Sequence, residues 1–107
     1  MNMNGFSTLE RVRIYCEDPQ PQPGLASPFV WWADRLGQQG ATQYMCNGLW
    51  EGMQEDSMVI EFIVSRGDAS ILSIAVHSLI REFCDLYDQE EILFTREPIM
   101  AQTVRIP

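Results

Sequence analysis

A regularly spaced stripe of apolar residues in the second half of the chain constrains the fold most. Between residues 69 and 87 the apolar side chains recur at intervals of three and four positions, so they share one face of a helix. These residues are Leu72, Val76, Leu79, Phe83 and Leu86. The spacing predicts a long amphipathic helix over residues 69–87, with Asp68 as its N-terminal cap after a turn at residues 66–68. Asp88 and Gln89 end it.

A second, shorter helix is predicted to begin after Ser27. Ser27 is a good N-cap, and Pro28 suits the first helical position, where its missing N–H has no helical partner to lose. Phe29, Trp32, Ala33 and Leu36 fall on one face, and Gly37 provides a left-handed stop. Trp31 lies about 100° round the helix from Trp32, so we expect it to be partly exposed.

Four segments carry the alternation or composition of β-strands: residues 10–16, 41–50, 57–64 and 91–95. Residues 51–56 connect the second and third as an antiparallel hairpin. Residues 99–106 form a further extended segment after Pro98, which a central strand would not accept. Residues 1–8 and 17–26 are expected to be irregular, and the second of these stretches is rich in proline.

The predicted order of elements is strand, helix, strand, strand, helix, strand, followed by an extended tail or extra strand. This is the order of a ferredoxin-like fold, a four-stranded antiparallel sheet with two helices on one face. With 107 residues, the chain has the length of a single domain, residues 1–107.

Several short segments also carry a family likeness: residues 12–15, Trp32, residues 48–50, residues 55–60 and residues 89–93. Together they resemble an uncharacterised family of small bacterial ferredoxin-like proteins. The resemblance implies the fold and no function, because none of these segments contains a catalytic motif.

Charge and cysteine content narrow the functional classes. Fifteen acidic residues face seven basic ones, giving a net charge of −8, and every basic residue is an arginine. Such a chain is expected to repel nucleic acid and anionic membranes, and to favour a basic protein partner or simply to remain soluble. The three cysteines lack paired spacing, and no leader or long apolar run is apparent, so we expect a cytoplasmic protein without a disulfide framework.

Catalytic and metal-binding patterns are absent from the sequence. His77 is the only histidine, and Cys84 follows it by two helical turns without a third group to orient the pair. The cysteines do not have the spacing of a zinc site, and no calcium loop is present. We therefore expect no enzyme activity and no cofactor.

Two acidic clusters and two tryptophans remain as candidates for binding. We expect a non-enzymatic interaction module that inhibits a basic nucleic-acid-handling protein, in the manner of phage anti-defence (anti-CRISPR-like viral) or immunity proteins. The clusters are expected to lie about one helix length apart. The candidate partner-binding residues are Glu51, Glu55, Asp56, Asp85, Asp88, Glu90, Glu91, Trp31 and Trp50.

The alternative is a small-molecule-binding or enzymatic protein, built as a dimeric ferredoxin-like barrel. In it, the uncovered face of the sheet, with Arg13, Tyr15 and Glu61, would pair with a second copy. A homodimer and a rise in melting temperature on ligand binding are its expected signatures.

Overall fold

The computed structural model describes residues 2–3, 5–37, 40–50 and 52–106, and at residues 2, 3 and 50 it describes the backbone alone. The elements are β1 (Asn2–Met3), β2 (Phe6–Glu17), α1 (Pro28–Leu36), β3 (Thr42–Trp50), β4 (Met53–Val64), α2 (Arg66–Tyr87) and β5 (Leu93–Ala101).

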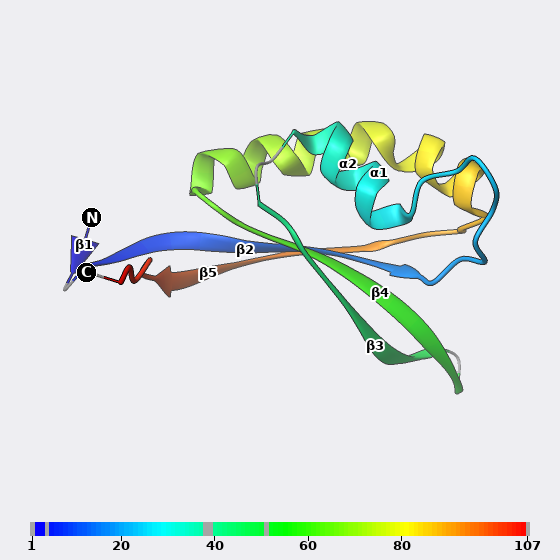
Figure 1. Ribbon diagram of the computed structural model, residues 1–107, viewed down its shortest axis with the longest axis horizontal. Helices are drawn as coiled ribbons and strands as arrows, with labels where there is room; N and C mark the ends of the chain where they lie inside the picture. The colour runs from blue at the N-terminus through cyan, green and yellow to red at the C-terminus, as the bar shows by residue number, and fades with distance from the viewer. Residues whose placement is uncertain (1, 4, 38–39, 51, 107) are drawn as a thin grey trace.

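The sheet is antiparallel, and its four main strands lie in the order β3, β4, β2, β5. β1 forms a short hairpin with the start of β2. Both helices cover the same face of the sheet, and no helix in the described part of the chain lies on the other face (Figure 1). The predicted ferredoxin-like βαββαβ fold is thus confirmed.

The core lies between the sheet and the helices. Val12 and Ile14 of β2 and Ile60 and Phe62 of β4 point to the helical side, as the period-two alternation predicts. They meet Trp32 of α1 and the stripe of α2, in which the side chains of Leu72, Val76 and Phe83 are almost fully buried.

The caps of α1 are those the sequence predicts. The Ser27 hydroxyl accepts a hydrogen bond from the Val30 N–H at 3.3 Å, and Gly37 ends the helix with φ 66°. The expected partial exposure of Trp31 is wrong, because only 3% of it is exposed. α1 packs on α2 as well as on the sheet, so Trp31 fills the contact between the helices, with its ring 5.3 Å from that of Phe83.

α2 begins three residues earlier than the sequence predicts. Ser65 is the N-cap, and its hydroxyl accepts a hydrogen bond from the Asp68 N–H at 3.1 Å. Asp68 lies in the first turn, where its charge suits the positive end of the helix. Leu86, expected in the buried stripe, is 40% exposed. Tyr87 is buried in the last turn instead, and its hydroxyl donates to the Ala26 carbonyl.

Three strand boundaries also differ from prediction. β1 and the start of β2 occupy residues expected to be irregular. β4 begins at Met53, because residues 53–56 pair with residues 47–50 although their polar side chains show no apolar alternation. β5 runs through Pro98 as one strand. β5 is an edge strand that pairs with β2 on one side. On its other side the backbone N–H groups point to solvent, so a proline, which has no N–H, can lie there without losing a hydrogen bond of the sheet.

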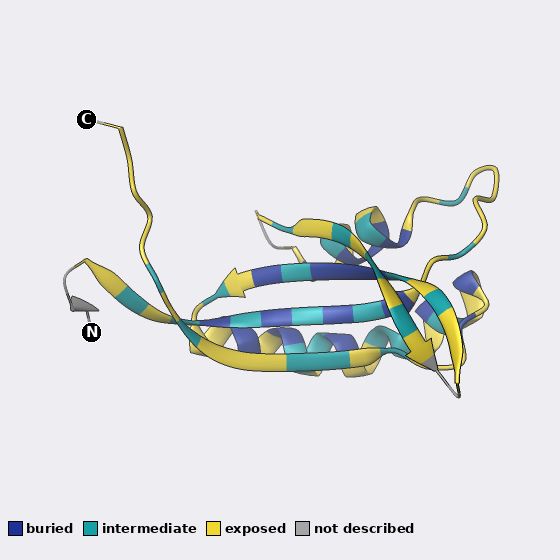
Figure 2. Cartoon of the chain, turned by 90° about the horizontal axis from the view of Figure 1, so that it is seen from below, coloured by how far each residue is buried: buried dark blue, intermediate teal, exposed yellow. Residues whose placement is uncertain are grey.

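The face without helices, here called the open sheet face, is turned toward the viewer in Figure 2. Arg11, Arg13 and Tyr15 of β2 lie on it. Val59 also lies on it, opposite Tyr15 and Tyr44 in the register, and is fully buried. No helix covers Val59, so its neighbours on the same face must shield it.

Candidate functional site

A groove of about 620 Å³ lies at one end of the open sheet face. It forms where the β3–β4 hairpin continues past the end of β2, so that the hairpin diverges from β2 and β5 (Figure 1). Its lining residues come from the end of β2, the hairpin, the loop between α2 and β5, and the first residue of β5: Tyr15, Cys16, Glu17, Cys46, Asn47, Gly48, Leu49, Glu55, Ser57, Asp88, Gln89, Glu90, Glu91, Ile92 and Leu93.

Neighbouring strands supply the floor of the groove. Tyr15 of β2 and Ser57 of β4 lie on the open sheet face by alternation, as does Gly48 of β3. A Cβ atom at Gly48 would lie 3.0 Å from the Ser57 hydroxyl oxygen, which is a tight contact. Glycine at this position therefore keeps the floor open.

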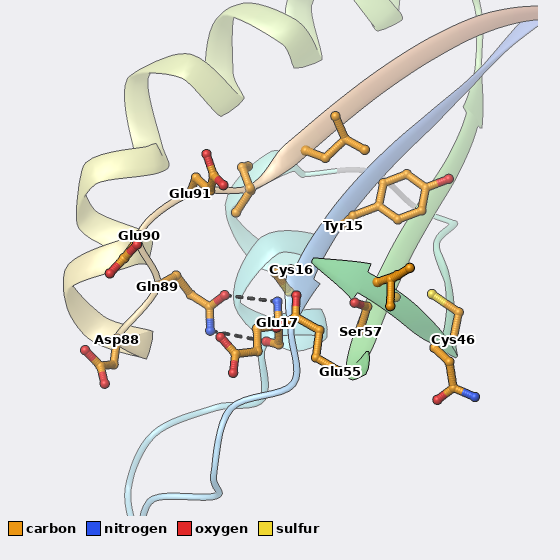
Figure 3. Close-up of a pocket in the computed structure, with 15 residues that line it drawn as sticks. Tyr15, Cys16, Glu17, Cys46, Glu55, Ser57, Asp88, Gln89, Glu90 and Glu91 are labelled. Atoms are coloured by element: carbon orange, nitrogen blue, oxygen red, sulfur yellow. Dashed lines mark hydrogen bonds between the residues drawn. The ribbon is translucent and has the colours of Figure 1, made fainter. Parts of the chain in front are cut away.

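The wall of the groove is the α2–β5 loop, which Gln89 holds in place. Its side-chain oxygen accepts a hydrogen bond from the Glu17 N–H at 3.0 Å. Its side-chain nitrogen donates to the carbonyls of Glu17 at 3.2 Å and Tyr87 at 3.3 Å. Gln89 thus continues the pairing of β2 with an amide side chain, and the loop is tied to the strand end (Figure 3).

The C-terminus of α2 also meets the groove. Asp88 ends the helix in the left-handed conformation, with φ 54°, and its N–H donates to the Cys84 carbonyl. The last carbonyls of a helix carry partial negative charge. The backbone therefore adds to the negative potential that the acidic side chains produce.

Five carboxylates line the groove, and they come from two strands and the loop (Figure 3). They are Glu17, Glu55, Asp88, Glu90 and Glu91. No arginine or histidine is among the described lining residues. Leu49, Ile92 and Leu93 supply apolar surface beside the aromatic ring of Tyr15.

The structure brings together candidates that the sequence places far apart. Glu55 of the hairpin lines the same groove as Asp88, Glu90 and Glu91, so the expected separation of the two acidic clusters by a helix length is wrong. β5 runs antiparallel to β2, so the loop before β5 lies next to the end of β2. Asp56 and Asp85 are exposed and outside the lining.

Three candidates remain: Trp31, Glu51 and Trp50. Trp31 is buried between the helices. Glu51 and the side chain of Trp50 lie outside the described residues. No sequence signal marked Glu17, Gly48 and Gln89 as site residues. Their roles depend on strand register and on the hydrogen bonds between the Gln89 side chain and the Glu17 backbone, here called the Gln89 clamp.

An ion-pair network lies beside the groove on the open sheet face. Glu61 accepts hydrogen bonds from Arg13 Nε at 2.8 Å and from the Tyr44 hydroxyl at 3.3 Å. Arg11 pairs with Glu97 at 3.0 Å. The bond to Glu61 raises the pKa of Arg13, and burial followed by the Glu61 charge raises the pKa of Tyr44. Two arginines and two glutamates thus balance their charges.

A second hollow, of about 410 Å³, lies beneath the start of α2. Its charged side chains are Glu10, Arg66 and Arg96. Arg96 binds both carboxylate oxygens of Glu10 at 2.8 Å, and this hydrogen bonding lowers the pKa of Glu10. Glu10 is 8% exposed, so the guanidinium of Arg96 is already engaged by a buried carboxylate.

Histidine and cysteine chemistry gains no support from the geometry. His77 is exposed, and its Nδ1 lies 2.7 Å from the Ser73 carbonyl oxygen. Burial raises the pKa of the Cys16 thiol to about 12, with the Asp18 and Cys84 charges as smaller causes. The pKa of Cys84 is raised in the same way. Within residues 2–3, 5–37, 40–50 and 52–106, no cluster of three or more metal-binding side chains occurs.

No protein family model matches the sequence, and no curated protein matches it. Two solved structures share the fold. The first is a nitrogen regulatory PII-like protein from Thiomonas intermedia K12, bound to ADP, AMP and bicarbonate, with 16% identity and a TM-score of 0.60 over 94% of this chain and 99% of that one. The second is a putative PII-like signalling protein from Thermus thermophilus, with 24% identity and a TM-score of 0.58 over 91% of each chain. At these identities the likeness shows the fold alone.

The likenesses correct the main functional prediction. The expected inhibitor of a basic nucleic-acid-handling protein is contradicted, because the similar structures are PII-like signalling proteins and one of them holds small ligands. The inhibitor, anti-CRISPR-like and viral descriptions and the basic protein partner have no support. The small-molecule alternative is favoured instead. In the described part of the chain, no helix has the length and apolar character to cross a membrane.

Proposed function

We propose that this protein is a non-enzymatic, small-molecule-binding regulatory module whose ligand occupies the groove at the end of the open sheet face. The observation that carries the proposal is the groove itself. It combines apolar surface from Ile92 and Leu93, the aromatic ring of Tyr15 and polar side chains, which is the usual composition of a ligand site.

The similar solved structures support the ligand class in general terms. The protein from Thiomonas intermedia K12 is bound to small molecules, and both similar proteins are described as regulatory or signalling proteins. A regulatory role also suits a loop whose position depends on the Gln89 clamp, because a ligand in contact with the loop can stabilise or release it.

We further propose that two copies associate through the open sheet face. Ile63 and Leu93 expose about half of their side-chain surface there, at 48% and 58%. The charges of Arg11, Arg13, Glu61 and Glu97 pair with one another, so the part of the face beside the groove is locally neutral, whereas the groove at its end is acidic. A second copy can therefore approach this face with less repulsion than elsewhere. Pairing there would also cover the floor of the groove.

Thermal unfolding in the presence of a panel of small metabolites tests the ligand proposal. We expect at least one compound to raise the melting temperature of the native protein. A Cys46→Trp variant, which places a large ring in the groove, should lose that rise. Gln43→Trp on the same strand is the matched control, because Gln43 is exposed outside the groove, and it should keep the rise.

An equal rise in melting temperature for the native protein and both variants would contradict the groove as the site. The absence of a rise with every compound would contradict the small-molecule function itself.

A further inference from the structure

The charge of the groove narrows the chemistry of its ligand, if the proposed function is correct. Its lining holds five acidic side chains, and no basic side chain is among the described lining residues. A cleft lined by one sign of charge between low-dielectric walls concentrates the field inside it. Four of the five, Glu17, Asp88, Glu90 and Glu91, are exposed, so water and salt screen part of this charge. Within a single chain, a ligand in this groove therefore meets a net negative lining.

The residues outside the described part of the chain cannot reverse this sign with their side chains. They are Met1, Asn4, Gln38, Gln39, Glu51 and Pro107, none of which is basic. The chain has no lysine, and each of its seven arginines is described and lies outside the lining. Arg13 borders the groove, because its Nη1 donates a hydrogen bond to the Tyr15 hydroxyl at 3.5 Å. Its charge is balanced by Glu61, at 2.8 Å from its Nε, and by Glu97, at 3.5 Å from its Nη1.

The backbone points in the same direction, independently of the side chains. Phosphates are usually held by arginine, lysine or the N–H groups at a helix N-terminus. Here the groove meets the C-terminus of the 22-residue helix α2, and Asp88 forms its cap. The helix dipole thus disfavours an anion and favours a cation at this position. Nucleotide phosphates and bicarbonate do not fit this site.

We infer that the ligand of the groove is an organic cation, with an amine group that pairs with the carboxylates and an apolar body that lies on Ile92, Leu93 and the ring of Tyr15. The ring face attracts a positive charge, and the aliphatic side chains favour methylene groups. A bare metal ion would leave that apolar surface unused. The open floor at Gly48 leaves room for the body of the ligand.

Calorimetric titration with spermidine, 1,4-diaminobutane, ADP, AMP and bicarbonate tests this inference at constant ionic strength. We expect an amine to bind and the anions not to bind. The double variant Glu55→Gln/Glu91→Gln should weaken amine binding about tenfold, because it removes the half-buried carboxylate of Glu55 and the exposed one of Glu91. The control Asp34→Asn/Asp85→Asn changes the net charge equally at sites outside the groove and should leave binding unchanged.

Equal weakening in both double variants would mean that the amines respond to net charge alone, and would overturn the inference. Absence of amine binding would overturn it as well. Binding of ADP, AMP or bicarbonate that is lost in Cys46→Trp would overturn the cationic class and leave the proposed ligand-binding function intact. If the metabolite panel also gave no rise in melting temperature, the proposed function would fail separately.

Discussion

The side chain of Gln89 forms two hydrogen bonds with the backbone of Glu17. The Glu17 N–H donates to the side-chain oxygen of Gln89 at 3.0 Å, and the side-chain nitrogen of Gln89 donates to the Glu17 carbonyl at 3.2 Å. Glu17 is the last residue of β2, and Gln89 follows the C-cap of α2. The clamp thus joins residues 72 positions apart in the chain and ties the loop that walls the groove to the end of β2. Stability and ligand binding should both depend on it.

Replacing Gln89 by alanine should destabilise the protein by about 1–3 kcal/mol, because partly buried backbone groups lose their partners. Urea unfolding measures this loss, and the same variant should bind the groove ligand more weakly because the loop is released. Gln22→Ala, at an exposed position in the loop before α1, is the control and should change neither quantity. Native stability in Gln89→Ala would show that the clamp is dispensable.

The Glu10–Arg96 pair should make stability depend on acid pH. Hydrogen bonding to Arg96 holds the pKa of folded Glu10 below its ordinary value of 4.5, so the unfolded chain takes up this proton first. The stabilisation is therefore present above that value and is lost as the pH falls through the lower, folded pKa. Melting temperatures of the native protein and Glu10→Gln should differ at neutral pH and converge in acid. A difference independent of pH would contradict this origin.

Removing the N-cap of α2 should cost about 1 kcal/mol of stability. In Ser65→Ala the Asp68 N–H loses the hydroxyl that accepts its hydrogen bond at 3.1 Å. Ser73→Ala, in the interior of the same helix, removes a hydroxyl with no capping role and serves as the control. Chemical denaturation of both variants measures the difference. An equal effect would mean that Ser65 does not act as a cap.

Self-association should depend on the open sheet face. Ile63 lies opposite Arg11 in the register, beside a network in which two arginines and two glutamates already balance. A further carboxylate there would leave each copy with an unbalanced negative charge in the proposed dimer interface, so Ile63→Glu should convert the dimer to a monomer. Ile74→Glu introduces the same charge at a position on α2 that is 73% exposed, and it should leave the dimer intact. Light scattering after size-exclusion chromatography gives the mass of each species. A native protein with the mass of one chain would contradict the proposed dimer.

The elements that local patterns encode were predictable from the sequence. Val12 and Ile14 alternate with polar residues, and the stripe from Leu72 to Phe83 repeats with the helical period, so both signals identify the core. Long-range packing was not predictable in this way. Trp31 is buried because α1 rests on α2, and the burial of Tyr87 in place of Leu86 depends on contact with Ala26. The likeness to a family of small ferredoxin-like proteins remains a prediction.

The site was only partly visible in the sequence. The acidic residues at Glu55 and at Asp88 to Glu91 stood out as unusual, yet their meeting in one groove depends on the register of β4 with β2. Gly48 and Gln89 have no signature of their own. Glycine in a strand and glutamine after a helix occur for many reasons, and their roles follow from contacts with Ser57 and Glu17.

The most direct test of ligand binding in the groove is a titration followed by two-dimensional ¹⁵N–¹H NMR of the labelled native protein, with spermidine as the first probe. We expect chemical-shift changes that saturate and concentrate at residues 15–17, 46–49 and 88–93, which line the groove. Changes spread over the acidic surface without saturation, or centred on the hollow beside Arg66 and Arg96, would contradict ligand binding in the groove.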